Sequence, residues 1–241
     1  MKKTRVHVTS LFSQVHQAPS VFFFHGAFNN NTELLHLAPL FSGMTMHFVD
    51  IPHHGLSSSD ATEACGVFDE VSSVVQLLRR SDQDLLVGVS MGALVAAHLQ
   101  QMLGFRFVLL GDPYLRFDET SPLFSKLENM LRHSVSNEQA VILRSFFGLT
   151  QSGSAGVVMS RAVDFSHLFR GGRGVIFAGG RSRQGGGTPS LFYDEHLVSI
   201  EHSFQIYRCE DLGHNVFGQG KIERIRNLVD KELVAYAKES V

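Results

Sequence analysis

Residues 85–92 read LLVGVSMG, an apolar run that leads into a serine between two glycines. A continuous apolar run of this kind is typical of a strand that other elements bury on both faces. The next residues, 93–103, include no Asp, Glu, Lys or Arg and many small side chains, as expected of a helix packed closely on a sheet. The stretch therefore predicts a buried strand, a tight turn at Ser90 and a helix.

Ser90 lies at the centre of the pattern G-x-S-x-G, whose glycines are Gly88 and Gly92. A turn this tight strains the serine backbone, and larger side chains two residues away on either side would collide with neighbouring backbone. Such a turn exposes the hydroxyl at the carboxyl edge of a sheet and points a helix N-terminus at a developing negative charge. An ordinary glycine-rich turn is the alternative, but the strand–turn–helix context favours a nucleophile at Ser90.

Short apolar runs alternate with helical patterns along most of the chain. This alternation predicts an α/β fold, in which a mostly parallel central sheet has helices on both faces. The predicted strands lie at 21–24, 46–49, 85–89, 105–110, 175–177 and 204–207, with an antiparallel edge strand within 6–15. The predicted helices lie at 66–80, 93–103 and 221–238.

Residues 114–168 interrupt the alternation with helical sequence in which no strand is predicted. Amphipathic spacing predicts one helix around Phe124–Leu131 and another around Val141–Phe147. A chain of 241 residues suits one domain with one insertion. We therefore expect a single domain over 1–241, with 114–168 forming a small helical lid whose phenylalanines and leucines line an acyl-sized pocket.

Two further segments lie where a nucleophile of this kind needs partners. The amide of Ala27, or that of Phe28 one residue on, follows the first buried strand and would hold an oxyanion together with the amide of Met91. His25 is expected to organise that loop. His214 follows the last predicted strand and precedes the C-terminal helix, which makes it the predicted general base.

Together these features resemble the α/β-hydrolase superfamily. Residues 50–57, DIPHHGLS, resemble its structural D-x-P-G-H-G-x-S loop, with His53 where glycine is usual. The resemblance covers nearly the whole chain outside the insertion, and it implies a serine hydrolase that needs no cofactor. His53 and His54 have no matching histidine or carboxylate pattern elsewhere, so we expect no metal site.

The acid of the catalytic triad departs from the superfamily's common pattern. That pattern places it in a G-x-x-D sequence after the strand before the last, where this chain has arginine. Asp112 instead follows the strand before the insertion. Thioesterase domains of polyketide and peptide synthases and some dehalogenases carry their acid at that position, and the chemistry does not specify which loop supplies it.

Asp112 is therefore the predicted acid, although an aspartate before Pro113 is also a common turn-former. Asp194 or Glu195 is the alternative acid further along the chain, and Asp211, three residues before the base, is a weaker one.

Composition limits the classes of function. With 21 basic and 23 acidic residues, a net charge of −2 gives no electrostatic case for nucleic acid or an anionic membrane. Cys65 and Cys209 form neither a disulfide framework nor a CxxC motif. No apolar run approaches the ~18 residues of a membrane span, and polar residues follow the basic start at 1–3 where a signal peptide would be apolar. We expect a cytoplasmic protein, and the oligomeric state stays open.

The resemblance implies a serine hydrolase that cleaves a small-molecule carboxylic ester or thioester with a hydrophobic acyl group through an acyl-enzyme. The position of Asp112 and the short chain favour a thioesterase-like enzyme. The alternatives are a non-catalytic α/β-hydrolase-like binding or interaction protein, suggested by the missing acid at its common place, and a lactonase or acyltransferase on the same scaffold.

Overall fold

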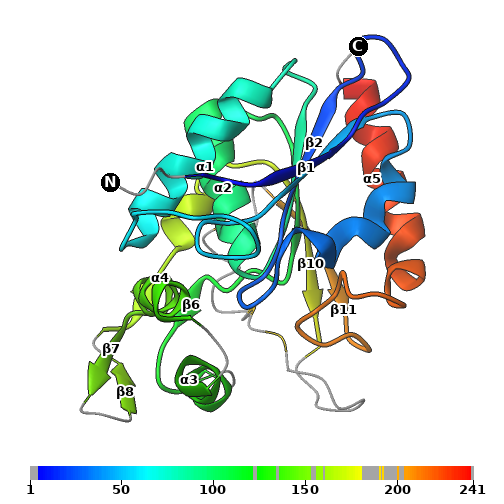
Figure 1. The fold of residues 1–241 in the computed structure, drawn as a ribbon. Helices are drawn as coiled ribbons and strands as arrows, with labels where there is room; N and C mark the ends of the chain where they lie inside the picture. Colours follow the sequence, from blue (N-terminus) through cyan, green and yellow to red (C-terminus); the bar gives the residue numbers. More distant parts are fainter. Residues whose placement is uncertain are drawn as a thin grey trace.

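The computed structural model describes residues 5–121, 124–133, 136–152, 156–159, 161–180, 190, 192, 200 and 204–239. Its centre is a seven-stranded sheet in the order β1-β3-β2-β4-β5-β10-β11 (Figure 1). Every neighbouring pair is parallel except β1 and β3, so the prediction of a mostly parallel sheet with an antiparallel edge strand is confirmed. The strands are β1 Val8–Leu11, β2 Ser20–Phe24, β3 Thr45–Val49, β4 Leu85–Val89, β5 Val108–Gly111, β10 Gly174–Gly179 and β11 Phe204–Cys209.

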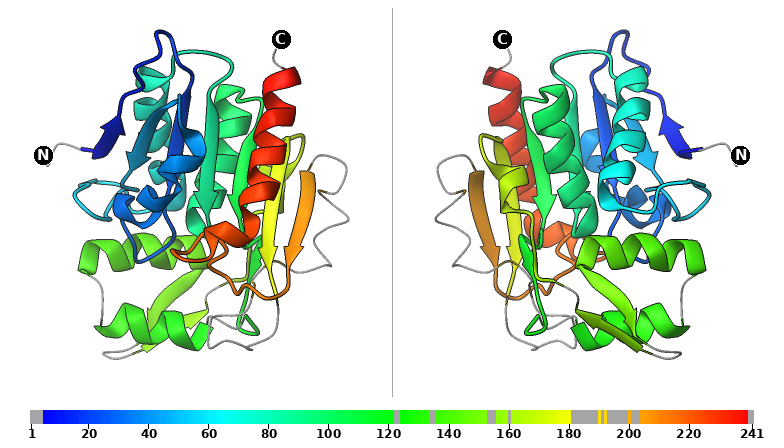
Figure 2. Two further views of the ribbon diagram at one scale, coloured as in Figure 1. Left: turned by 90° about the vertical axis from the view of Figure 1, so that its right-hand side faces the viewer. Right: turned by 90° about the vertical axis from the view of Figure 1, so that its left-hand side faces the viewer.

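Helices cover both faces of this sheet (Figure 2). One face carries α1 (Ala64–Leu78) and α2 (Met91–Leu103), and the other carries the 3-10 helix η1 (Asn31–Phe41) and α5 (Ile222–Glu239). No helix among the described residues is long and apolar enough to cross a membrane.

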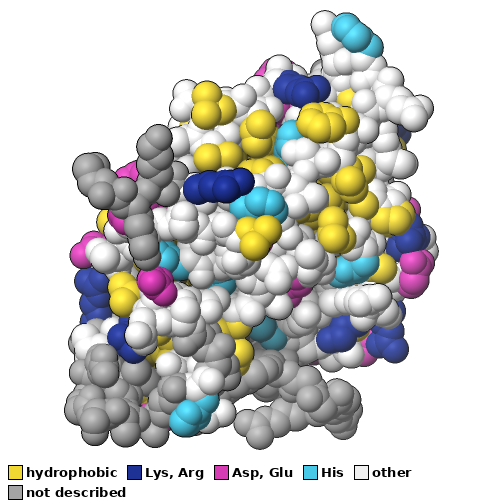
Figure 3. Space-filling view, viewed as in Figure 1, with side chains coloured by type: hydrophobic (Ala, Val, Ile, Leu, Met, Phe, Trp, Pro, Cys, Tyr) yellow, Lys and Arg dark blue, Asp and Glu magenta, His cyan; other side chains and the backbone are white. Residues whose placement is uncertain are grey.

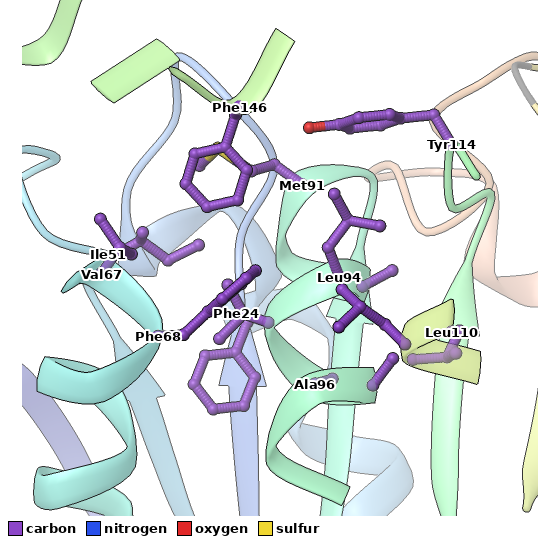
Figure 4. Packing of buried hydrophobic residues seen from close by; sticks show 14 of the residues in the cluster. Phe24, Ile51, Val67, Phe68, Met91, Leu94, Ala96, Leu110, Tyr114 and Phe146 are labelled. Carbon is purple, nitrogen blue, oxygen red and sulfur yellow. The ribbon is translucent and has the colours of Figure 1, made fainter. Parts of the chain in front are cut away.

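The two faces explain why β2 reads as an unbroken apolar run. Successive side chains of a strand point to opposite faces, so Phe22 and Phe24 pack in the core under α1 and α2, while Val21 and Phe23 pack in the core under η1 and α5. Figure 4 shows Phe24 of β2 between the apolar side chains of α1 and α2. The alternating cores leave no polar face on β2, which is buried along its whole length.

Most of the segment 114–168 lies beyond the carboxyl ends of the parallel strands (Figure 1), and its last residues pack along α2. Its two predicted helices are present as α3 and α4, but the prediction that it holds no strand is wrong. Four strands of two to four residues form two antiparallel pairs, β6 with β9 and β7 with β8. Strands this short give no alternating apolar signal in the sequence. The elements are β6 Arg116–Phe117, α3 Phe124–His133, α4 Asn137–Phe147, β7 Leu149–Ser152, β8 Gly156–Met159, β9 Val163–Asp164 and the 3-10 helix η2 Ser166–Phe169.

The helix η1 is an element that the sequence pattern did not predict. It begins after Asn30, whose side chain accepts a hydrogen bond from the amide of Thr32, and it contains Pro39. A 3-10 helix turns every three residues, so its buried side chains do not follow the 3.6-residue period. Its first turn carries Glu33, which reaches the site described below.

Candidate active site

Ser90 occupies the turn between β4 and α2 with a φ of +53°. A Cβ atom on Gly88 would lie 2.3 Å from the carbonyl oxygen of Gly92, and one on Gly92 would lie 2.1 Å from the carbonyl oxygen of Phe24. Both distances are far below any real contact, so the turn tolerates only glycine at these two positions. The strained turn that the sequence predicts is therefore present.

The side chains of Ser90, His214 and Asp112 form a continuous hydrogen-bonded line. His214 Nε2 lies 2.8 Å from Ser90 Oγ, and His214 Nδ1 lies 2.5 Å from Asp112 Oδ2. Asp112 is fully buried, whereas the His214 side chain is 13% exposed. The imidazole is thus held by a buried carboxylate on one side and reaches the hydroxyl on the other.

Parallel strands of one sheet bring these residues together. Ser90 follows β4, Asp112 follows β5, and the amide of Ser90 donates a hydrogen bond of 2.8 Å to the carbonyl of Gly111. His214 comes from the loop after β11. All three strands end at the same edge because they are parallel.

Asp112 is held on its other oxygen as well. Its Oδ1 accepts hydrogen bonds from the amide of Gly179, at 2.9 Å, and from the hydroxyl of Ser190. Asp211, by contrast, has a side chain that is 63% exposed and pairs with Arg224. The alternatives Asp194 and Glu195 lie outside the described residues, as do Arg181 to Arg183 after β10.

The predicted oxyanion donors border the same site. Ala27 and Phe28 line the cavity above Ser90, and Met91 opens α2. The first amides of a helix have no partner within it. Within the described part of the chain, no hydrogen bond is found from the amide of Ala27 or from that of Met91 to a protein acceptor. Both amides are therefore available to a ligand.

A cavity of about 330 Å³ lies over Ser90 and His214. Its apolar lining includes Leu127 and Met130 of α3 and Phe147 of α4, all from the segment 114–168. Its polar lining includes Asn29, Glu33, Asn215 and Lys221.

Glu33 is a site residue that the sequence reasoning missed. Its Oε2 accepts a hydrogen bond of 2.8 Å from the amide of Gly26, and its Oε1 accepts one of 2.7 Å from the side chain of Asn29. Burial raises the pKa of the Glu33 carboxyl, against the opposing effects of the Gly26 amide and the charge of His214. The sequence signal was weak, because Glu33 belongs to no motif and lies in the unpredicted 3-10 helix.

His25 and His54 are buried beneath this loop. His25 Nδ1 donates a 2.7 Å hydrogen bond to the carbonyl of Gly26, while its Nε2 accepts one from the amide of Ile51. Burial, reinforced by the neighbouring His54, lowers the pKa of His25 to about 3. Burial also lowers the pKa of His54 to about 4. Both rings are therefore neutral at physiological pH, and His25 contacts the loop backbone as expected.

The paired histidines at 53 and 54 lie in a structural turn. The carboxylate of Asp50 accepts hydrogen bonds from the amides of Asn31 and Leu56, and a Cβ on Gly55 would lie 2.4 Å from that carboxylate. The described residues contain no group of three or more His, Cys, Asp or Glu side chains arranged to hold a metal ion.

Comparison with known proteins identifies the family of the chain. The model of the alpha/beta hydrolase family matches residues 21–216, so the chain belongs to that family. Membership supports hydrolytic activity. A comparison with curated proteins gave no match.

Solved structures of the same fold include several hydrolases. E-2-(acetamidomethylene)succinate hydrolase is 18% identical, with a TM-score of 0.69 over 96% of each chain. A thermophilic esterase from Thermogutta terrifontis is 14% identical, with a TM-score of 0.67 over 97% of this chain and 94% of its own. The thioesterase domain from the curacin biosynthetic pathway is 18% identical, with a TM-score of 0.61 over 95% and 96%. At sequence identities this low, the comparison shows that the fold is shared.

Proposed function

We propose that the protein is a serine hydrolase that cleaves a carboxylic ester or thioester with a hydrophobic acyl group. The observation that carries the proposal is the line of hydrogen bonds from Ser90 Oγ through His214 to Asp112. The three groups meet the geometric requirement for a nucleophile, a base and a residue that orients the base.

The reaction would proceed through an acyl-enzyme. His214 Nε2 takes the proton of Ser90 as Oγ attacks the acyl carbon, and the resulting oxyanion accepts hydrogen bonds from the amides of Ala27 and Met91. The protonated imidazole then gives its proton to the departing alcohol or thiol. A water molecule, deprotonated by His214, releases the carboxylic acid and restores Ser90. Asp112 holds the imidazole in one tautomer and stabilises its cation throughout.

The apolar wall of the cavity supports a hydrophobic acyl group. Leu127, Met130 and Phe147 come from α3 and α4, so we propose that 114–168 acts as a lid that carries the acyl pocket within one domain over 1–241. The origin of the acid on β5 favours a thioester over a simple ester. The thioesterase domain from the curacin pathway has a similar fold, and its activity supports a thioester substrate by analogy alone.

The alternative of a non-catalytic binding protein is less well supported. It was suggested because arginine stands where the superfamily usually has its acid. In this chain a buried carboxylate from a different strand, that of Asp112, contacts His214 instead. We further propose a cytoplasmic location, which the free thiols of Cys65 and Cys209 favour over an oxidising compartment.

A fluorophosphonate probe tests the proposal directly. Attack by Ser90 Oγ on the phosphorus displaces fluoride and leaves the probe bound to the protein. We expect stoichiometric labelling of the wild type and none of Ser90→Ala, with Ser59→Ala as a matched control that labels normally because Ser59 is buried outside the site. A folded wild type that does not label would contradict the proposal. A panel of acyl esters, thioesters and lactones would then rank the substrates by kcat/KM.

A further inference from the structure

The loop that carries the amide of Ala27 is held by hydrogen bonds on both sides of Gly26. The carbonyl of Gly26 accepts a 2.7 Å hydrogen bond from His25 Nδ1, and its amide donates a 2.8 Å hydrogen bond to Glu33 Oε2. Glycine has the widest choice of backbone angles of any residue, so both of its peptide groups need an anchor to stay in one orientation. His25 and Glu33 supply one anchor each.

The direction of the Ala27 amide follows from these anchors. The carbonyl of Gly26 and the N–H of Ala27 belong to one planar trans peptide, in which the two groups point in opposite directions. Because the carbonyl points down to the buried ring of His25, the N–H of Ala27 points the other way. The hydrogen bond to Glu33 fixes the preceding peptide and so stops rotation about Gly26.

Glu33 is itself held in place. It stands in the first turn of η1, and its second oxygen accepts a 2.7 Å hydrogen bond from the side chain of Asn29. The loop also lies directly on the nucleophile turn, because a Cβ on Gly92 would meet the carbonyls of Phe24 and His25 at 2.1 and 2.5 Å. A shift of the loop would therefore change the position of the Ala27 amide relative to Ser90.

The presence of the Glu33 carboxylate on the cavity wall requires an explanation. Negative charge near a developing oxyanion is unfavourable, and burying a carboxyl group costs free energy unless it is hydrogen-bonded. The chain nevertheless places Glu33 on the cavity wall, where both of its oxygens are used by the loop.

We propose that Glu33 is a positioning residue that orients the Ala27 amide through its hydrogen bond to the amide of Gly26. The inference rests on the proposed function, since the oriented amide matters only if an oxyanion forms at Ser90. Glu33 orients the amide through this hydrogen bond and not through its negative charge.

Three substitutions separate the hydrogen bond from the charge. Glu33→Ala removes both. Glu33→Asp keeps the charge but is one methylene too short to reach the amide of Gly26. Glu33→Gln keeps an acceptor for that amide and loses the charge, and the Asn29 amide can turn its oxygen toward the new NH₂ group. Glu119→Ala, at an exposed position in the lid segment, is the matched control.

We expect kcat on a thioester to fall about 30-fold in Glu33→Ala and Glu33→Asp with KM within twofold, less than the loss on removing an oxyanion donor outright. Glu33→Gln should stay within about threefold of the wild type. An alkyl trifluoromethyl ketone, which Ser90 attacks to form a stable oxyanion, should bind about 30-fold more weakly to Glu33→Ala and Glu33→Asp than to the wild type.

Several outcomes would overturn the inference. They are a wild-type kcat in Glu33→Ala or Glu33→Asp, an unchanged affinity for the ketone, or a Glu33→Gln variant as slow as Glu33→Ala. Should Glu33→Ala fail to fold, the Asp and Gln variants decide the question alone. A wild type that neither labels nor turns over would defeat the proposed function instead, so the two failures are distinguishable.

Discussion

At the scale of single residues, the candidate site depends on how the His214 ring is held. The ring contacts a buried carboxylate at Nδ1 and a hydroxyl at Nε2, so Asp112 determines which nitrogen carries the proton. Ser90 and His214 could be predicted from a motif and from chain order. Asp112 could be predicted only from the strand ends that carry a carboxylate and from the resemblance to superfamily branches whose acid follows this strand. Glu33 could not be predicted, because its role depends on a fold contact with Gly26 seven residues away.

Asp112→Asn tests the role of the acid. The asparagine oxygen can still accept hydrogen bonds from Gly179 and Ser190, so the fold should persist. The amide cannot stabilise the imidazolium, and kcat should fall by about 10⁴-fold, as for other triad aspartates. Steady-state kinetics and the thermal unfolding midpoint measure the two effects. Asp211→Asn, at an exposed carboxylate near His214, should keep its activity, and equal losses in both variants would contradict the assignment.

At the scale of elements, the strands of the sheet were predictable and the connections were less so. Buried parallel strands give continuous apolar runs such as 85–89, and amphipathic helices give a 3.6-residue period. The helix η1 and the strands β6 to β9 give neither signal, since one has a different period and the others are too short. The missed helix is the element that carries Glu33, which explains why the site was incomplete from sequence alone.

The helix α3 supplies a test of the proposed acyl pocket. Met130→Trp should fill part of the apolar side of the cavity, because Met130 lines it. We expect kcat/KM for an octanoyl ester to fall at least about tenfold while that for an acetyl ester stays within threefold, since binding of a longer apolar chain is worth about 0.8 kcal/mol for each buried methylene. Met102→Trp, on the exposed end of α2, is the control. An unchanged preference for chain length in Met130→Trp would show that the pocket lies elsewhere.

At the scale of the whole molecule, the carboxylates of Asp50 and Asp112 are buried and hydrogen-bonded, whereas many other charged side chains lie on the surface. On the face seen in Figure 3, acidic and basic side chains are interspersed, and no large area of one sign is visible. Inside, the histidines 25, 47, 54 and 98 all have pKa values lowered by burial. Neutral buried histidines make the folded state sensitive to acid.

The difference in histidine pKa between the folded and the unfolded chain determines how stability changes with pH. Below pH 6.5 the unfolded chain protonates His54, whereas in the folded chain its pKa of about 4 keeps it neutral. The free energy of unfolding therefore falls as the pH drops from about 6.5 toward 4, by roughly 1.4 kcal/mol per pH unit for this residue. Urea unfolding between pH 7.5 and 5 should show a shallower pH dependence in His54→Gln. The exposed His16→Gln variant should follow the wild type, and identical slopes in all three proteins would refute the prediction.

The place of Asp112 at the end of β5 has one more consequence. The strand β10 lies beside β5 and ends at the same edge of the sheet, yet the sequence after it need not supply a carboxylate, because Asp112 already contacts the imidazole from β5. The end of β10 is thereby freed from the residue that the superfamily usually requires there, while the amide of Gly179 and the hydroxyl of Ser190 keep a supporting role by holding Asp112.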